Sequence, residues 1–179
     1  MANLEPLIQS IPVAPLKLAS LEGCRTLADQ VNNYLVSFRH ESPTNVGQAD
    51  SLQGYCADSY LLECECPRFG SGEGKGVLKE SVRGCDLFIM VDVTNYSLTY
   101  RVNGYENHMS PDNHYQDLKR IISAADGKAR RINVIMPFLY EGRQPKRSKR
   151  ESLDCALMLQ ELVDMGVSNI LTFDAHDPR

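Results

Sequence analysis

The chain has 179 residues, of which 42% are apolar and 23% are charged, and this length and balance suffice for a folded domain with its own core. Its formal net charge of −4 argues against a general nucleic-acid binder, because such domains are normally basic. No apolar stretch approaches the roughly 20 residues needed to cross a bilayer, and the N-terminal stretch MANLEPLIQSIPVAP lacks the features of a secretory signal. We therefore expect a cytoplasmic protein without a membrane partner.

Six cysteines are present, and in a cytosolic protein of this size we expect them to be reduced thiols of the core. Cys64 and Cys66 are two residues apart in an alternating segment, so they should share one face of a strand. With Cys56 they could begin a zinc site, but no second Cys or His pair completes the ligand set.

The first third of the chain predicts a helix followed by short strands. Apolar residues recur at helical spacing over 24–38, whereas 41–57 is polar and glycine-bearing and predicts a loop or an insertion. Residues 60–66 alternate as in a strand, and GSGEGKG at 70–76 separates them from another short strand at 76–79. This glycine-rich run lacks the phosphate-loop frame, so it is a weak candidate for a phosphate site.

The middle of the chain predicts a buried strand and then a hairpin. Residues 86–92, DLFIMVD, form a nearly continuous apolar run, as expected of a strand covered on both faces. In the following segment Asn103-Gly104 separates two aromatic and β-branched stretches, which is a strong signal for a β-hairpin near 97–108.

A helix and a second strand-helix-strand unit complete the pattern. Ser110 and Pro111 predict the start of a helix that runs to Gly127, with a buried stripe of Leu118, Ile121, Ile122 and Ala125. Next come a strand at 131–137, a helix at 152–165 closed by Gly166, and a strand at 169–173. Repeated units of this kind predict an α/β fold in which a parallel sheet is flanked by helices.

Ligands of parallel sheets gather beyond the carboxyl ends of the strands, where we expect the turn after Asp92, the loop after Pro137 and the tail after Phe173. The loop after Pro137, FLYEGRQPKRSKRES, is strongly basic, with cationic side chains at Arg143, Lys146, Arg147, Lys149 and Arg150. This pattern favours a phosphate-rich ligand, because the following helix N-terminus also attracts anions. A solvated charged loop or a localisation signal is the alternative.

The tail places Asp174, His176 and Asp177 within four positions of one another. A carboxylate and an imidazole at the end of a strand can hold Mg²⁺ together with substrate phosphate oxygens. Alternatively, His176 is a structural histidine oriented by a neighbouring carboxylate. The other histidines, His40, His108 and His114, have no partner at a sequence spacing that would indicate a site, and we expect them to be surface or structural residues.

Four separated segments together resemble the ribose-phosphate pyrophosphokinases, also called PRPP synthetases. They are FGSGE (69–73), KESVRGCDLFIMVD (79–92), the pair Arg143-Gln144 and ILTFDAH (170–176). The resemblance runs from about residue 14 to the end, and it implies a phosphoribosyltransferase-type fold. It also implies that 1–179 is an N-terminal domain, whose C-terminal partner would grip ribose 5-phosphate and carry the catalytic Lys and Arg.

The resemblance also implies roles for particular residues. Phe69, Ser71 and Glu73 would form a loop that contacts adenine in the ATP site of a neighbouring subunit, which implies a homo-oligomer. Arg143 and Gln144 would contact the nucleotide, with Lys146 and Arg147 as further phosphate contacts. Mg²⁺ would be held by His176 and Asp174. No catalytic residue is expected within these 179 residues.

This sequence departs from the family pattern in four places. The family usually has Asn or Asp where Ser71 stands and Asp where Pro145 stands, the basic loop is one residue shorter, and the hairpin near 97–108 is an addition. We expect the full-length protein to transfer the diphosphoryl group of MgATP to ribose 5-phosphate, giving PRPP and AMP. A non-catalytic regulatory homologue that acts through oligomer contacts is the alternative. A nucleic-acid binder is disfavoured because no aromatic residues interleave with the basic ones.

Overall fold

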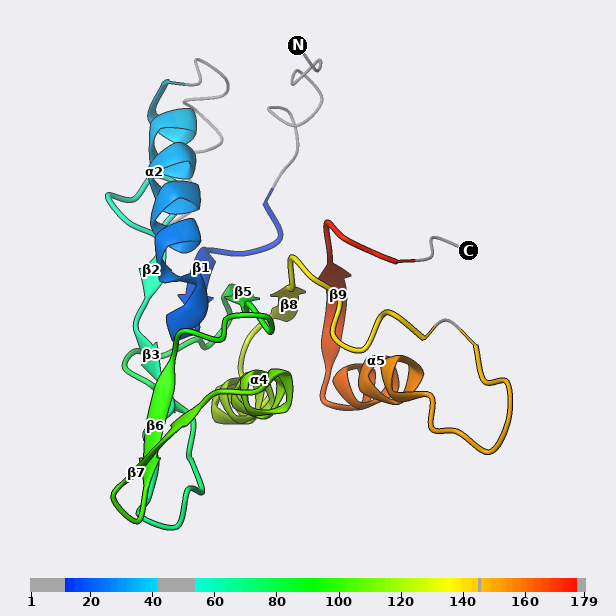
Figure 1. Cartoon of the computed structure of the whole chain (residues 1–179). Coiled ribbons are helices and arrows are strands. Elements are labelled where there is room, and N and C mark those ends of the chain that lie inside the picture. Colours follow the sequence, from blue (N-terminus) through cyan, green and yellow to red (C-terminus); the bar gives the residue numbers. More distant parts are fainter. Residues whose placement is uncertain (1–11, 42–53, 145, 177–179) are drawn as a thin grey trace.

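The structure, a computed structural model, describes residues 12–41, 54–144 and 146–176 (Figure 1). None of the helices in these ranges is long and apolar enough to cross a membrane. The elements in chain order are β1 (Leu16–Ser20), the short 3-10 helix η1 (Glu22–Cys24), α2 (Arg25–Glu41), β2 (Leu61–Leu62), β3 (Cys64–Glu65), β4 (Val77–Leu78), β5 (Asp86–Met90), β6 (Thr99–Val102), β7 (Tyr105–His108), α4 (Pro111–Ala125), β8 (Arg131–Ile135), α5 (Asp154–Asp164) and β9 (Val167–Leu171).

A five-stranded parallel sheet in the order β2-β1-β5-β8-β9 forms the centre of the molecule. Its middle strand β5 pairs along its whole length with β1 on one side and β8 on the other. This arrangement confirms the predicted α/β fold with a parallel sheet. It also places the carboxyl ends of neighbouring strands at one edge, because all the strands run in the same direction.

Helices cover both faces of the sheet. Leu87 and Ile89 of β5 belong to the apolar cluster that includes Leu118 and Ile121 of α4. Met90, on the opposite face of the same strand, packs in a second cluster with Ala28 of α2. The continuous apolar run of β5 is therefore explained by burial on both faces, as predicted.

Helix α4 begins where the sequence predicts. The hydroxyl of Ser110 accepts a hydrogen bond from the backbone N–H of Asn113 at 3.2 Å, and Pro111 occupies the first turn. The predicted stripe of the helix is buried, including Leu118 and Ile121. The helix ends at Ala125, two residues before Gly127, because Asp126 already adopts a left-handed conformation with φ 49°.

The predicted hairpin is confirmed. Strands β6 and β7 form a separate two-stranded antiparallel sheet, joined by Asn103 and Gly104. Both turn residues have positive φ, 50° and 85°, as the two-residue turn of a tight hairpin requires.

The prediction of a single strand at 60–66 is wrong. Residues Leu61–Leu62 pair with β1 in the central sheet, whereas Cys64–Glu65 pair in the antiparallel direction with β4. The chain changes sheets at Glu63, whose carbonyl accepts a hydrogen bond from Lys79 N at 3.0 Å. An alternating pattern shows which residues point inward but not which strand lies alongside, so the change was not visible in the sequence.

The ends of the other helices and strands differ from the predicted ends by a few residues. The helix predicted at 24–38 is α2 and runs on to Glu41, and the helix predicted at 152–165 is the shorter α5. The strand predicted at 76–79 is β4, and the strand predicted at 131–137 is β8, which ends at Ile135. The strand predicted at 169–173 is β9 and starts earlier, directly after Gly166, whose φ is 88°. Most of the polar stretch 41–57 lies outside the described residues.

The cysteines of the described ranges are free thiols. Cys24 and Cys64 are buried, Cys66 is half-buried and packs against the main apolar cluster, and Cys56 is exposed. Cys64 and Cys66 thus point to the same interior, as predicted. Burial raises the pKa of Cys64 to about 11.

The burial of β5 leads to a stability prediction. Leu87 is 0% exposed, so Leu87→Ala should lower the free energy of unfolding of the chain by about 2 to 5 kcal/mol, because it leaves a cavity beneath α4. The matched control is Leu157→Ala on α5, where the side chain is 58% exposed and the change should stay within about 0.5 kcal/mol. Denaturant unfolding of the two variants measures the difference, and equal losses would contradict the packing described here.

Candidate nucleotide and metal site

The ends of β8 and β9 bring the start of the basic loop and the tail together. The carbonyl of Pro137 accepts hydrogen bonds from the backbone N–H groups of Phe173 and Asp174, both at 3.0 Å. Phe138 and Asp174 continue the parallel pairing of the two strands as an isolated bridge. The two segments that the sequence singled out as reactive therefore lie side by side, as expected for neighbouring parallel strands.

A small pocket lies between these two segments. Its volume is about 50 Å³, and it is lined by Phe138, Leu139, Gly142, Arg143, Asp174 and His176. The guanidinium of Arg143 lies 5.6 Å from the centre of the Phe138 ring, so a cation–π contact helps to hold it over the pocket. The structure thus brings together three of the predicted site residues, Arg143, Asp174 and His176.

These three side chains are exposed and carry complementary chemistry. A guanidinium binds phosphate oxygens through charge-assisted hydrogen bonds, while a carboxylate and an imidazole can bind a cation. Mg²⁺ commonly takes only one or two protein ligands and completes its shell with water and substrate phosphates, so Asp174 and His176 fit a shared magnesium site. Within the described ranges no three His, Cys, Asp or Glu side chains gather closely enough to hold a metal by themselves, and Asp177 lies outside those ranges.

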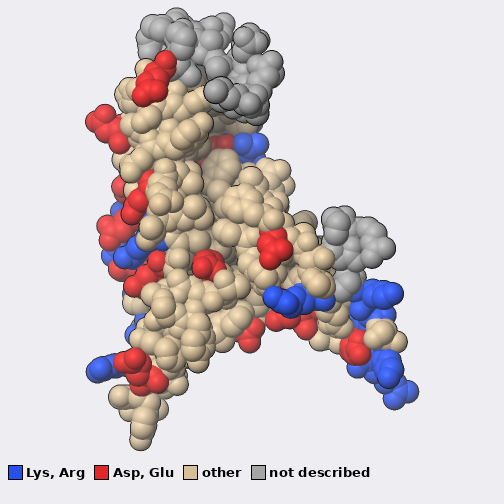
Figure 2. Space-filling model, turned by 45° about the horizontal axis from the view of Figure 1, so that its top comes forward, with Lys and Arg blue, Asp and Glu red and all other residues tan. Residues whose placement is uncertain are grey.

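The remaining basic-loop residues do not line this pocket. The side-chain amide of Gln144 donates to the carboxylate of Glu151 at 3.2 Å, which ties the two ends of the loop together. Lys146 and Arg147 are exposed, and Pro145 between them and Gln144 lies outside the described residues. Figure 2 shows Lys and Arg side chains gathered on the arm at the lower right, which is the loop before α5.

Residues 69–73 form a tight turn at the end of a short antiparallel ladder. Arg68 and Gly74 bridge across its base, and Phe69 N donates to the carbonyl of Glu73 at 2.7 Å. The hydroxyl of Ser71 donates to the Glu73 carboxylate at 2.8 Å. Phe69 is 53% exposed, so the turn presents an aromatic ring to the solvent.

This turn is remote from the pocket at the ends of β8 and β9. Figure 1 shows it beside the β6–β7 hairpin, whereas the basic loop and the tail lie on the other side of the molecule beyond β8. The structure therefore does not bring Phe69, Ser71 and Glu73 together with Arg143 and His176 in one chain.

Two glycines of GSGEGKG, Gly72 and Gly76, are required by close packing. A Cβ at Gly72 would lie 2.9 Å from Val102 Cγ2, and a Cβ at Gly76 would overlap the backbone carbonyl of Arg120 in α4. Gly70 has open space around it. Close contacts with the hairpin and with α4 therefore explain these two glycines without a phosphate loop, for which the sequence evidence was also weak.

A buried ion pair at the base of the turn was not predicted. Arg68 donates to both carboxylate oxygens of Asp117 at 2.7 Å, and the two side chains are only 9% and 6% exposed. Burial lowers the pKa of Arg68, but the hydrogen bonds to Asp117 outweigh this effect and raise it overall. The sequence carried a signal for the burial of Asp117, because it lies on the face of α4 with the buried Leu118 and Ile121, but no signal for its partner.

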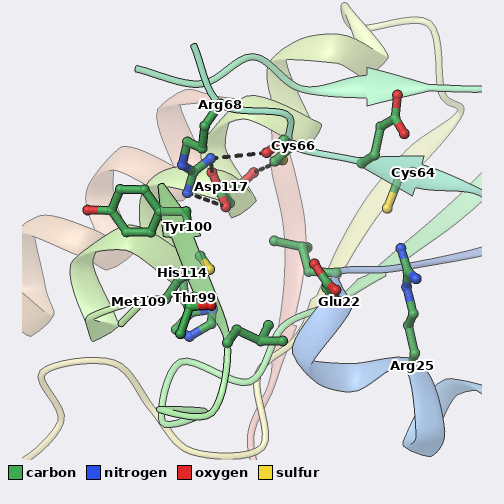
Figure 3. Close-up of a pocket in the computed structure, with 13 residues that line it drawn as sticks. Glu22, Arg25, Cys64, Cys66, Arg68, Thr99, Tyr100, Met109, His114 and Asp117 are labelled. Atoms are coloured by element: carbon green, nitrogen blue, oxygen red, sulfur yellow. Dashed lines mark hydrogen bonds and ion pairs between the residues drawn. The ribbon is translucent and has the colours of Figure 1, made fainter. Parts of the chain in front are cut away.

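A cavity of about 110 Å³ lies next to this ion pair (Figure 3). Arg68, Asp117 and Tyr100 lie along one side of it, with Cys64 and Cys66 of the β3 segment above and His114 of α4 below. His114 is 2% exposed and its Nε2 lies 2.6 Å from the carbonyl oxygen of Asn95, so it is a structural histidine.

Comparison with known proteins identifies the family and the fold of the chain. The family described as the N-terminal domain of ribose phosphate pyrophosphokinase matches residues 16–166. Curated ribose-phosphate pyrophosphokinases of Corynebacterium ammoniagenes and Bacillus cereus are each 29% identical over 166 residues, which cover 92% of this chain and 41% of the relative. A crystal structure of phosphoribosylpyrophosphate synthetase from Mycobacterium smegmatis has a TM-score of 0.66 at 24% identity, over 91% of this chain and 43% of that chain.

The structural match confirms the predicted phosphoribosyltransferase-type fold. The chain spans about two-fifths of the length of these curated relatives. Because the family match covers residues 16–166, which is most of the chain, the chain belongs to the family of N-terminal domains of ribose phosphate pyrophosphokinases.

Proposed function

We propose that this chain is the nucleotide-binding part of a ribose-phosphate diphosphokinase, which transfers the diphosphoryl group of MgATP to ribose 5-phosphate and yields PRPP and AMP for nucleotide biosynthesis. The observation that carries the proposal is the meeting of Arg143, Asp174 and His176 in one pocket at the carboxyl ends of β8 and β9. A chain of this family that kept only the fold would have no need to keep a cation, a carboxylate and an imidazole at that place.

Each residue of the pocket has a role in this proposal. Arg143 binds a phosphate oxygen of ATP, held in place by the ring of Phe138. Gln144 contacts the nucleotide, while Lys146 and Arg147 add positive charge next to the polyphosphate. Asp174 and His176 hold Mg²⁺, which neutralises charge on the transferring phosphates. The protein contributes mainly position and electrostatics, with no covalent step of its own.

The adenine of ATP is contacted by Phe69, Ser71 and Glu73 in this proposal. Because these residues lie far from the pocket of their own chain, they serve the pocket of a neighbouring subunit, and the protein acts as a homo-oligomer. The hydrogen bond from Ser71 to Glu73 leaves the second carboxylate oxygen of Glu73 free of any side-chain partner among the described residues. Ribose 5-phosphate binds to a C-terminal half like that of the longer relatives.

The first prediction from this proposal concerns the division of the active site between the two halves of the full-length protein. The purified 179-residue chain should form no PRPP, because the ribose 5-phosphate site and the catalytic Lys and Arg are expected in the other half. The measurement is AMP formation from ATP with and without ribose 5-phosphate. Formation of AMP that depends on ribose 5-phosphate would contradict the proposal. The full-length protein serves as the control, and its complete inactivity would favour the regulatory homologue instead.

A second prediction tests Arg143. In the full-length protein, Arg143→Ala should weaken the use of ATP by about 1.5 to 3 kcal/mol, the typical value of a hydrogen bond to a charged group. Arg150→Ala is the matched control, since Arg150 is an exposed cation of the same loop that does not line the pocket. Steady-state kinetics with varied ATP separates the two variants. Unchanged KM and kcat in Arg143→Ala would remove this residue from the site.

A third prediction separates metal binding from a structural role for His176. If His176 binds Mg²⁺, His176→Ala in the full-length protein should raise the Mg²⁺ concentration for half-maximal rate and leave the melting temperature unchanged, because this side chain is exposed. His40→Ala at the exposed end of α2 is the matched control. A lowered melting temperature with an unshifted Mg²⁺ curve would end the metal assignment.

A further inference from the structure

The hairpin β6–β7 has one packed face and one free face. Along β6, Tyr100 and Val102 are half-buried while their neighbours are exposed, and every residue of β7 is exposed. Alternation of this kind shows that β6 packs against something through one face. In Figure 1 the segment beside it is the 69–73 turn.

Direct contacts join the hairpin to that turn. The backbone N–H of Asn103 donates to the carbonyl of Gly70 at 3.3 Å. Val102 fills the space that a side chain at position 72 would need, with Cγ2 only 2.9 Å from the place of a Cβ. Gly72 has a φ of 91°, so both the conformation and the packing at this point require glycine.

Tyr100 extends the contact to the base of the turn. Its ring lies 5.3 Å from the guanidinium of Arg68, which is itself bound by Asp117 of α4 (Figure 3). The guanidinium is thus held between a carboxylate and an aromatic ring. Since Arg68 directly precedes Phe69, the position of the turn is tied both to α4 and to the hairpin.

The hairpin is itself anchored to the core of the domain. The side-chain amide of Asn95, just before the hairpin, donates to the carbonyl of Gly23 at 3.3 Å. On the other side Met109 is buried, with only 9% of its surface exposed, while its backbone N–H closes the base of the hairpin by donating to Leu98 O at 2.9 Å. An element held at both of its ends can act as a fixed support for what packs on it.

We propose that the hairpin β6–β7 is a positioning element, in which Tyr100 and Val102 hold the 69–73 turn in its nucleotide-contacting arrangement inside a single subunit. The turn then keeps its shape without help from a neighbouring chain. The nucleotide role of the turn rests on the proposed function, whereas the support of the turn by the hairpin does not.

Hydrogen exchange on the 179-residue chain tests the support directly. In Tyr100→Ala and in Val102→Ala, exchange at the backbone amides of Phe69 and Gly72 should speed up by about tenfold or more, because these amides bond only within the turn. Amides of β5 should keep their protection, which shows that the fold is intact. Tyr100→Phe keeps the ring over Arg68 and should restore slow exchange. Tyr105→Ala, at a side chain 77% exposed on β7, is the matched control and should change nothing.

Unchanged exchange at Phe69 and Gly72 in both alanine variants would overturn the proposal, and so would faster exchange over the whole domain. Kinetics of the full-length protein supply the second readout. Tyr100→Ala should raise KM for ATP by about tenfold or more with little change in kcat, and Tyr100→Phe should reverse this. Faster exchange with an unchanged KM would uphold the support of the turn and contradict its nucleotide role, so the two failures are distinguishable.

Discussion

The burial of β5 on both faces is the constraint on which the rest of the domain depends. Leu87 and Ile89 face α4, Met90 faces α2, and the strand is hydrogen-bonded to β1 and β8 along its length. Its neighbours run parallel to it, and parallel strands need crossover connections, whose helices cover both faces of the sheet. The meeting of the basic loop and the tail at one edge is a direct result, because parallel strands end on the same side.

Helix α4 connects the two proposed halves of the nucleotide site. In its first turn, Asp112 accepts a hydrogen bond from the Tyr140 hydroxyl of the basic loop at 2.6 Å, and Tyr115 stacks on the same ring at 4.7 Å. Five residues further along the helix, Asp117 holds Arg68 at the base of the 69–73 turn. The start of this one helix therefore contacts the basic loop, and its middle contacts the base of the 69–73 turn, although the loop and the turn lie far apart.

The sequence predicted the features that depend on neighbouring residues. Ser110 and Pro111 marked the start of α4, and the Asn103-Gly104 pair marked the hairpin, because caps and tight turns are decided within a few positions. The pocket at the strand ends was also predictable, since the topology alone brings the two loops together.

What the sequence did not reveal depends on contacts between distant segments. The change of sheets at Glu63 depends on which strand lies alongside, and a residue pattern does not encode that choice. The pairing of Arg68 with Asp117 joins positions 49 residues apart, and the contact of Val102 with Gly72 joins a turn to an added hairpin. Each depends on the packing of the whole domain, and no local rule of turns or helices predicts it.

The close approach at Gly76 has a consequence for protein engineering. The glycines of 70–76 look interchangeable in the sequence, yet these positions would differ strongly in the side chains that they tolerate in a saturation library. Gly70 is open to substitution. Any side chain at Gly76 would collide with the backbone of α4 and displace β4 together with the 69–73 turn. Variation of this run should therefore start at Gly70, with Gly72 and Gly76 kept as glycine.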